Sequence, residues 1–124
     1  MPSLLSGCRV LVIEDEYFLA DDMVRLLREL DAKIVGPFGE VGDALEFVKG
    51  GGQVDVALLD INLRGEMIYP VAEELRRRDI PFIFTSGYER KPLPAEYDDV
   101  PMLEKPVDDG AVQLALCQLL QSHR

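Results

Sequence analysis

The residues best suited to chemistry in this sequence are five polar side chains that end short apolar runs. In chain order they are Glu14, Asp15, Asp60, Ser86 and Lys105. Each of these residues alone would be ordinary at the end of a strand. Together they are informative, because all five lie at the same place relative to an apolar run, at its end. If the apolar runs are strands of a single parallel sheet, their carboxyl ends lie at one edge, and these side chains converge there.

Three of these side chains are carboxylates, and three negative charges packed together are costly unless a cation joins them. Oxygen ligands of this kind suit Mg²⁺, so we expect Glu14, Asp15 and Asp60 to bind it. A carboxylate beside a divalent ion can attack phosphorus and form an aspartyl phosphate, and we assign that role to Asp60. Lys105 supplies a second positive charge, and the Ser86 hydroxyl can donate a hydrogen bond to a phosphoryl oxygen.

Apolar runs alternate with helical patterns five times, which is the order expected for a parallel sheet covered by helices on both faces. A stop at Gly36-Pro37 ends the second run. The strands are expected at Val10–Ile13, Ala32–Val35, Val54–Leu59, Pro81–Thr85 and Met102–Leu103. The fold class is therefore α/β, a flavodoxin-like doubly wound five-stranded parallel sheet with strand order 2-1-3-4-5.

Helical periodicity fills the intervals between these runs, with one exception. The apolar stripe of the first helix recurs every three or four residues, at Leu19, Met23, Leu26 and Leu30. Asp108 is placed to cap the last helix. The exception is the segment Glu89–Asp99, which contains Pro92 and Pro94 and is poor in core residues. We therefore expect an irregular or shortened fourth helix there, as a loop or a single turn.

Composition and charge exclude several classes of protein. A chain of 124 residues fits one domain, which we expect to span residues 1–124. Its net charge of −10 repels phosphate backbones, so a nucleic-acid partner is not expected. No segment approaches the ~20 apolar residues that cross a bilayer, and no signal peptide is present, so we expect a cytoplasmic protein without a membrane partner. Cys8 and Cys117 match no metal or disulfide spacing and are expected to be buried, reduced thiols.

Three short motifs resemble those of response-regulator receiver domains. They are Ile13-Glu14-Asp15-Glu16, Leu58-Leu59-Asp60-Ile61-Asn62-Leu63 and Glu104-Lys105-Pro106. The resemblance covers essentially the whole chain. It implies that Asp60 is phosphorylated, that Glu14 and Asp15 bind Mg²⁺, and that the backbone carbonyl of Asn62 is a further metal ligand. It also implies a cis peptide bond between Lys105 and Pro106.

The residues after the fourth strand resemble a subgroup of alphaproteobacterial single-domain receivers that carry a Phe-Ala-Thr-Gly-type motif. The matching stretch is Phe84-Thr85-Ser86-Gly87-Tyr88, followed by Leu93-Pro94. This alignment puts Ser86, rather than Thr85, at the phosphate. Many receivers carry an aromatic residue three places before the lysine, but Met102 stands there in this chain. We therefore expect Ser86, Gly87 and Tyr88 to form the switch and to reorder residues 87–99 on phosphorylation.

The resemblance implies a phosphorylation-dependent signalling switch in a two-component phosphorelay. The phosphoryl group would come from a histidine kinase or a histidine phosphotransfer protein. The chain would then contact a downstream protein, or act as a phosphate sink for the kinase. We expect a receiver that stands alone, and no enzyme activity beyond its own phosphorylation and dephosphorylation.

Two other functional classes remain open. A haloacid-dehalogenase-like aspartyl-phosphate phosphatase also uses an aspartate nucleophile with Mg²⁺. It expects that nucleophile after the first strand, with a second acid two places on, where this chain has Asn62. A flavin-binding flavodoxin-like carrier needs a phosphate loop rich in serine, threonine and glycine after the first strand. This chain has the acidic stretch from Glu14 to Glu16 there.

Overall fold

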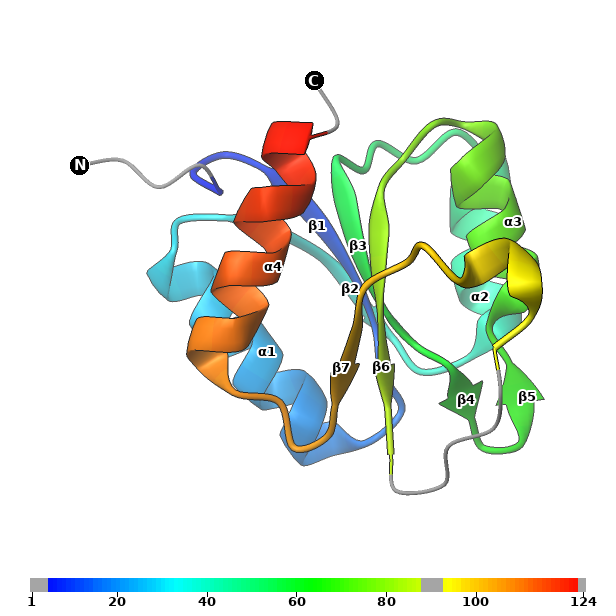
Figure 1. Ribbon diagram of the computed structural model, residues 1–124, viewed down its shortest axis with the longest axis horizontal. Coiled ribbons are helices and arrows are strands. Elements are labelled where there is room, and N and C mark those ends of the chain that lie inside the picture. The colour runs from blue at the N-terminus through cyan, green and yellow to red at the C-terminus, as the bar shows by residue number, and fades with distance from the viewer. Residues whose placement is uncertain (1–4, 88–92, 123–124) are drawn as a thin grey trace.

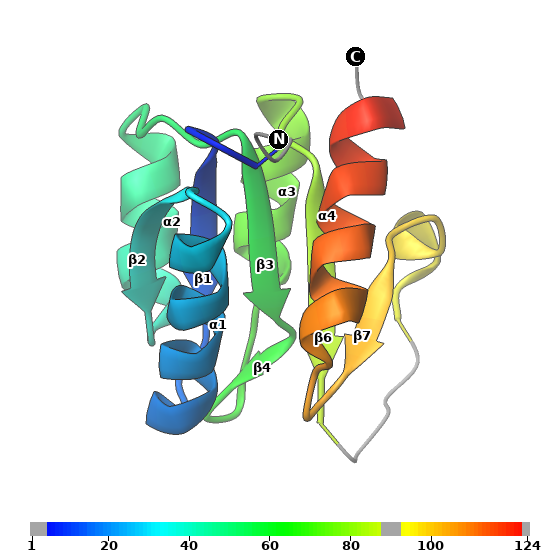
Figure 2. The ribbon, with the colours of Figure 1, turned by 90° about the vertical axis from the view of Figure 1, so that its left-hand side faces the viewer.

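The computed structural model describes residues 5–87 and 93–122 and shows a sheet between two layers of helices (Figure 1). Helices α1 and α4 cover one face, and α2 and α3 cover the other (Figure 2). The elements are β1 (Arg9–Ile13), α1 (Tyr17–Glu29), β2 (Lys33–Phe38), α2 (Val41–Lys49), β3 (Val56–Asp60), β4 (Asn62–Leu63), β5 (Glu66–Met67), α3 (Tyr69–Arg77), β6 (Phe82–Ser86), the 3₁₀ turn η1 (Ala95–Tyr97), β7 (Met102–Glu104) and α4 (Asp109–Ser122).

The main sheet has five parallel strands in the order β2-β1-β3-β6-β7. This is the expected doubly wound order 2-1-3-4-5, so the fold class is confirmed. Strands β1 and β3 are neighbours, paired from Val10 with Val56 to Ile13 with Leu59. Their carboxyl ends therefore open side by side at the same edge of the sheet, and the residues that follow them are brought together.

The core consists of two apolar layers, one on each face of the sheet. Successive strand residues point to opposite faces, so Val10 and Val12 pack under α1 and α4 while Leu11 and Ile13 pack under α2 and α3. Because both faces of β1, β3 and β6 are buried, these strands are continuously apolar rather than alternating. No helix within residues 5–87 and 93–122 combines the length and apolar character that crossing a membrane requires.

Strand β2 departs from the expected stop, because it continues through Gly36-Pro37 to Phe38. It lies at the edge of the sheet, where a proline without an N–H group is tolerated. The pairing with β1 shifts between Leu11 and Ile13, and Gly36 absorbs the shift with a φ of 100°. A Cβ at Gly36 would lie 2.8 Å from the backbone N of Phe38, so this position requires glycine.

The segment between β6 and β7 contains a single 3₁₀ turn, η1, among its described residues 93–101. This confirms the expected loss of a regular fourth helix over that part of the chain. The expectation that the segment is poor in core residues is wrong at Tyr97, which is 2% exposed. Its ring stacks on Tyr69 and meets Phe84 edge-on, each at 5.5 Å between centroids. The Arg76 guanidinium lies over the same ring, 4.9 Å from its centroid.

The last helix begins as the sequence predicts. The backbone N of Ala111 donates to Asp108 Oδ2 at 3.0 Å, so Asp108 caps α4. The two cysteines differ from expectation, because Cys8 and Cys117 are free but only partly buried. Both lie at the margin of the layer under α1 and α4, packed against it rather than within it.

Candidate functional site

The three predicted carboxylates meet at the carboxyl edge of the sheet. Glu14 and Asp15 follow β1, and Asp60 ends β3. Each offers a carboxylate oxygen, and these atoms all lie within 4.8 Å of one another. The pairing of β1 with β3 explains the convergence, because Ile13 lies opposite Leu59 and the next residues are the acids. The structure thus brings together three acids that are separated in sequence by up to 46 positions (60 − 14).

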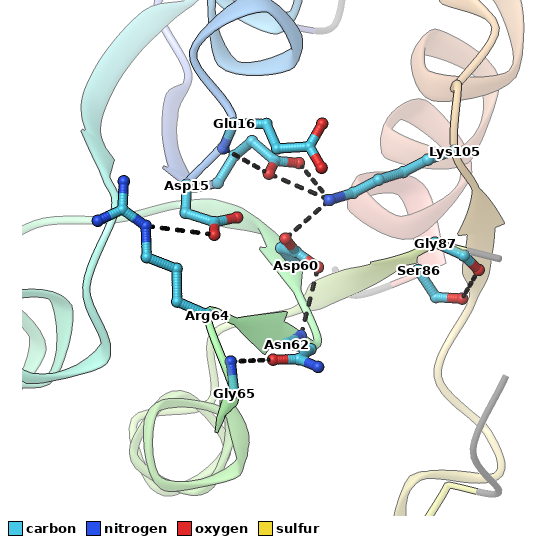
Figure 3. A network of polar contacts seen from close by, with 10 residues as sticks. Asp15, Glu16, Asp60, Asn62, Arg64, Gly65, Ser86, Gly87 and Lys105 are labelled. Carbon is cyan, nitrogen blue, oxygen red and sulfur yellow. Dashed lines mark hydrogen bonds and ion pairs between the residues drawn. The ribbon is translucent and has the colours of Figure 1, made fainter. Parts of the chain in front are cut away.

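Lys105 reaches this cluster from the end of β7 (Figure 3). Its Nζ donates a hydrogen bond to Asp60 Oδ2 at 2.7 Å and another to Glu14 Oε2 at 3.1 Å. The same nitrogen lies 2.8 Å from Glu14 Oε1. The peptide bond between Lys105 and Pro106 is cis, as the sequence predicts. One ammonium group therefore forms ion pairs with two carboxylates that are almost entirely buried.

Glu14 is the most enclosed of the three acids, at 3% exposed. Its Oε2 accepts a second hydrogen bond from the backbone N of Glu16 at 3.1 Å. Its Oε1 is buried and has no hydrogen-bond partner among the described residues, although the charge of Lys105 is near. Apart from this ion pair with Lys105 at 2.8 Å, Oε1 has no donor among the described residues, and it retains lone pairs that a cation could use.

Burial dominates the acid–base properties of this cluster. It raises the pKa of Glu14 to about 7, against hydrogen bonds from Lys105 and from the backbone of Glu16 that lower it. Burial likewise raises the pKa of Asp60, and the hydrogen bond and charge of Lys105 again oppose the rise. For Lys105, burial disfavours the charged form, but its hydrogen bonds to Asp60 and Glu14 and their charges outweigh it, and its pKa is raised. Burial therefore favours the neutral form of both acids, and Lys105 offsets this preference only in part.

A shallow depression of about 330 Å³ opens over the cluster, and Asp15, Asp60, Arg64 and Lys105 are among the residues that line it. Asp15 is the most accessible acid, with a side chain 14% exposed. The donor set is the three clustered carboxylates, of which Asp15 and Asp60 line the depression. Such a set fits a hard divalent ion of the Mg²⁺ class, which binds through few carboxylates and keeps several waters.

Asn62 lies beside the cluster at the start of a short hairpin, β4 and β5, that sequence analysis missed. Its backbone N donates to Asp60 Oδ1 at 3.3 Å, and its side-chain Oδ1 accepts from the backbone N of Gly65 at 2.7 Å. The hairpin turns at Arg64-Gly65, and two residues ending in glycine between short strands are the sequence signal that could have revealed it. The role expected for the Asn62 carbonyl stays a prediction.

Ser86 ends β6 at the same edge, but its hydroxyl does not contact the acids. The Oγ donates to the carbonyl oxygen of Gly87 at 3.2 Å, and Figure 3 shows the two residues turned away from Asp60. The backbone of Ser86 is tied to the site, since its carbonyl accepts from Lys105 N at 2.8 Å. Thr85, the alternative hydroxyl, is buried inside β6. The third expected switch residue, Tyr88, lies outside the described residues.

Solved structures share this fold and much of this sequence. SdrG from Sphingomonas melonis Fr1 is 41% identical, with a TM-score of 0.81 over 92% of this chain and 97% of that one. The BeF3-activated conformation of SdrG from Pseudomonas melonis Fr1 is 40% identical, with a TM-score of 0.75 over 97% and 99%. A response regulator receiver protein from Sinorhizobium medicae WSM419 is 23% identical, with a TM-score of 0.81 over 97% and 99%, and supports the fold alone.

Among curated proteins, the sensory transduction protein LytT of Bacillus subtilis is 28% identical over 116 residues, which cover 87% of this chain. LytT of Oceanobacillus iheyensis is 28% identical over 112 residues, covering 86%. In each case the match covers 46% of the curated protein, so the chain spans about half the length of these relatives. No family model matches the chain.

Proposed function

Since this chain belongs to the response regulator receiver domains, we propose that it is a phosphorylation-dependent switch of a two-component phosphorelay with Asp60 as the phosphoacceptor. One observation carries the proposal. The Asp60 carboxylate ends the central strand, 2.7 Å from Lys105 Nζ, and clusters with the carboxylates of Glu14 and Asp15. A protein 40% identical to this chain has been solved in a BeF3-activated conformation, which implies aspartyl phosphorylation in such relatives.

In the proposed reaction, a carboxylate oxygen of Asp60 attacks the phosphorus of the donor and forms an oxygen–phosphorus bond. The bond from phosphorus to the leaving group breaks, and its electron pair leaves with the donor atom. For a phosphohistidine on a histidine kinase or phosphotransfer protein, that atom is an imidazole nitrogen. Phosphoryl transfer depends mostly on positioning and charge neutralisation. The Lys105 ammonium already lies beside the Asp60 carboxylate, close enough to pair with the oxygens of a phosphoryl group bound there.

Glu14, Asp15 and Asp60, with the backbone carbonyl of Asn62, are the residues we propose to hold Mg²⁺. Bound there, the ion would neutralise the phosphoryl oxygens as charge builds on them. The lone pairs of Glu14 Oε1 that its ion pair with Lys105 leaves free, and the accessible position of Asp15 in the depression, support this assignment. Within the described residues, the ion pairs of these three acids are with Lys105 and with the exposed guanidinium of Arg64.

Ser86 is proposed as the residue that reports phosphorylation. Its hydroxyl makes a single hydrogen bond of 3.2 Å, to the Gly87 carbonyl, so a rotation about χ1 would free it for a phosphoryl oxygen at a small energetic cost. Gly87 would follow, and the further effect on Tyr88 and residues 87–99 stays part of the proposal. Met102 cannot supply an aromatic indicator, which makes another reporter necessary.

The proposed output is protein contact. The phosphoryl donor would be a histidine kinase or a histidine phosphotransfer protein. The phosphorylated chain would bind a downstream protein or drain phosphate from its kinase. The haloacid-dehalogenase-like phosphatase and the flavin carrier find no support, because the nucleophile follows β3 and acids occupy the place of a flavin phosphate loop.

Incubation with acetyl phosphate and Mg²⁺, followed by intact mass spectrometry, tests this function. We expect one added phosphoryl group, absent when a chelator removes the metal. Asp60→Asn should not be labelled, whereas Asp22→Asn, which removes the same negative charge from an exposed residue of α1, should label like the wild type. Labelling that persists fully in the chelator, or a continuous turnover of added phosphoesters, would contradict the proposal.

A further inference from the structure

Arg64 occupies a backbone position that arginine does not favour. It forms the turn of the β4–β5 hairpin together with Gly65, and both residues have positive φ, 52° and 91°. Glycine adopts this left-handed region freely, whereas a residue with a Cβ gives up about 1 kcal/mol there. The hydrogen bond from Gly65 N to Asn62 Oδ1 at 2.7 Å holds the turn in place. A strained arginine at the rim of a charged site raises the question of what its side chain does.

The side chain of Arg64 pairs with Asp15. Its Nε lies 3.7 Å from Asp15 Oδ2, and Figure 3 shows the guanidinium on the side of the carboxylates opposite Lys105. The ion pairs that Lys105 makes in the described chain go to Glu14 and Asp60. Asp15 thus has a counterion of its own, one that the sequence did not indicate.

The ion pair between Arg64 and Asp15 is weak enough for a cation to displace it. At 3.7 Å it lies beyond hydrogen-bond distance, and the Arg64 side chain is 77% exposed, so its attraction is screened by solvent. Lys105, by contrast, is almost enclosed and makes two hydrogen bonds. A divalent ion entering the depression would meet Asp15 already neutralised by a mobile charge, and it would have to push a guanidinium of like sign aside.

We propose that Arg64 is a positioning residue that neutralises Asp15 in the metal-free site, yields that carboxylate to Mg²⁺, and thereby weakens the affinity of the site for the ion. The inference rests on the proposed function, because it takes Asp15 to be a metal ligand. Its consequence is that the hairpin turn sets the Mg²⁺ concentration at which phosphorylation becomes efficient, without touching the phosphoryl group.

Calorimetric titration with Mg²⁺ at low ionic strength tests the inference. Arg64→Gln keeps a polar, though shorter, side chain and removes its charge, and we expect its dissociation constant for Mg²⁺ to fall about two- to fivefold. Arg25→Gln is the matched control, because it breaks an exposed pair with Asp21 (3.3 Å) on α1 and changes net charge equally. An Arg64→Gln affinity equal to that of the control, or weaker than that of the wild type, overturns the inference.

A second readout separates this role from contact with the phosphoryl donor. In Arg64→Gln the Mg²⁺ concentration for half-maximal labelling by acetyl phosphate should fall, while the rate at saturating Mg²⁺ stays that of the wild type. A lower saturating rate would mean that Arg64 serves the donor, and it contradicts the proposal. If neither protein binds Mg²⁺, the proposed function itself fails; if both bind it equally, only the role of Arg64 fails.

Discussion

At the scale of single residues, the chemistry of this site follows from how few positive charges surround its acids. Lys105 is one ammonium group between Glu14 and Asp60, and both carboxyls have raised pKa values because burial outweighs that partner. The sequence placed these side chains correctly, since each ends an apolar run. It could not show that Lys105 would bridge two acids, or that Arg64 would pair with Asp15, because both contacts depend on side-chain geometry.

The burial of Glu14 predicts how stability changes with pH in the metal-free protein. Its pKa is about 7 in the folded chain, against an ordinary value of 4.5. Between these values the folded state holds the extra proton, so the free energy of unfolding is highest below pH 4.5 as far as Glu14 contributes, and falls as pH rises to about 7. We expect a loss on the order of 3 kcal/mol across that window, measured by urea unfolding in chelator.

Glu14→Gln should flatten this dependence, because glutamine carries no proton to lose. In this variant the free energy of unfolding should still fall with pH, but less steeply, because the pKa of Asp60 is also raised. Glu40→Gln, on an exposed residue before α2, is the matched control and should keep the wild-type slope. A Glu14→Gln profile identical to the wild type, or wild-type stability that rises between pH 5 and about 7, would refute this account of the buried acid.

Lys105→Ala should separate metal binding from phosphorylation. The proposed metal ligands are all oxygens, so calorimetry should still detect Mg²⁺ binding. The rate of labelling by acetyl phosphate should fall about a hundredfold, because the charge beside the attacked phosphoryl group is lost. Lys49→Ala, at the exposed end of α2, controls for loss of a lysine. Loss of Mg²⁺ binding together with a retained labelling rate would show that the assigned role is wrong.

At the scale of elements, the segment between β6 and β7 is where sequence reasoning was least complete. Two prolines correctly predicted the loss of a regular helix. The sequence did not predict that the Tyr97 side chain would be buried in the core, because a single aromatic residue among polar ones shows no apolar periodicity. The ring packs against Phe84, which lies two residues before Ser86 in β6. The described end of this segment is therefore anchored to the strand that carries the proposed reporter.

Tyr97→Ala should accordingly lower the free energy of unfolding more than a substitution in an exposed loop would. Removing a buried aromatic ring from contact with Tyr69, Phe82 and Phe84 should lower the free energy of unfolding by about 3–4 kcal/mol. Glu96→Ala, an exposed neighbour in the same turn, should change it by less than about 0.5 kcal/mol. Urea unfolding of both variants makes the comparison. Equal, small effects would mean that η1 is not part of the core.

At the scale of the whole molecule, the fold could be predicted because it depends on pattern. Strands buried on both faces, such as Val56–Asp60, give continuous apolar runs, and their alternation with helices leaves few topologies. The errors came where tertiary context overrides local signals. Gly36-Pro37 reads as a stop but continues an edge strand, and Asn62–Met67 is too short to show strand periodicity yet forms the hairpin that carries Arg64.

The parallel arrangement of the whole sheet explains why the site lies at one of its edges. Five parallel strands present their carboxyl ends together, and the acids, the serine and the lysine follow four different strands there. A chain of net charge −10 gathers three of its carboxylates at this edge and covers two of them almost completely. Such an arrangement is costly unless a cation is bound there, which supports the proposed Mg²⁺ site.

Chemical mapping of the acyl phosphate tests that central claim most directly. After reaction with acetyl phosphate and Mg²⁺, borohydride reduces an aspartyl phosphate to homoserine, and peptide mass spectrometry locates the converted residue. We predict conversion at position 60 alone, and none in Asp60→Asn. Conversion at Glu14 or Asp15, or undiminished labelling of Asp60→Asn, would contradict the assignment of Asp60 as the phosphoacceptor.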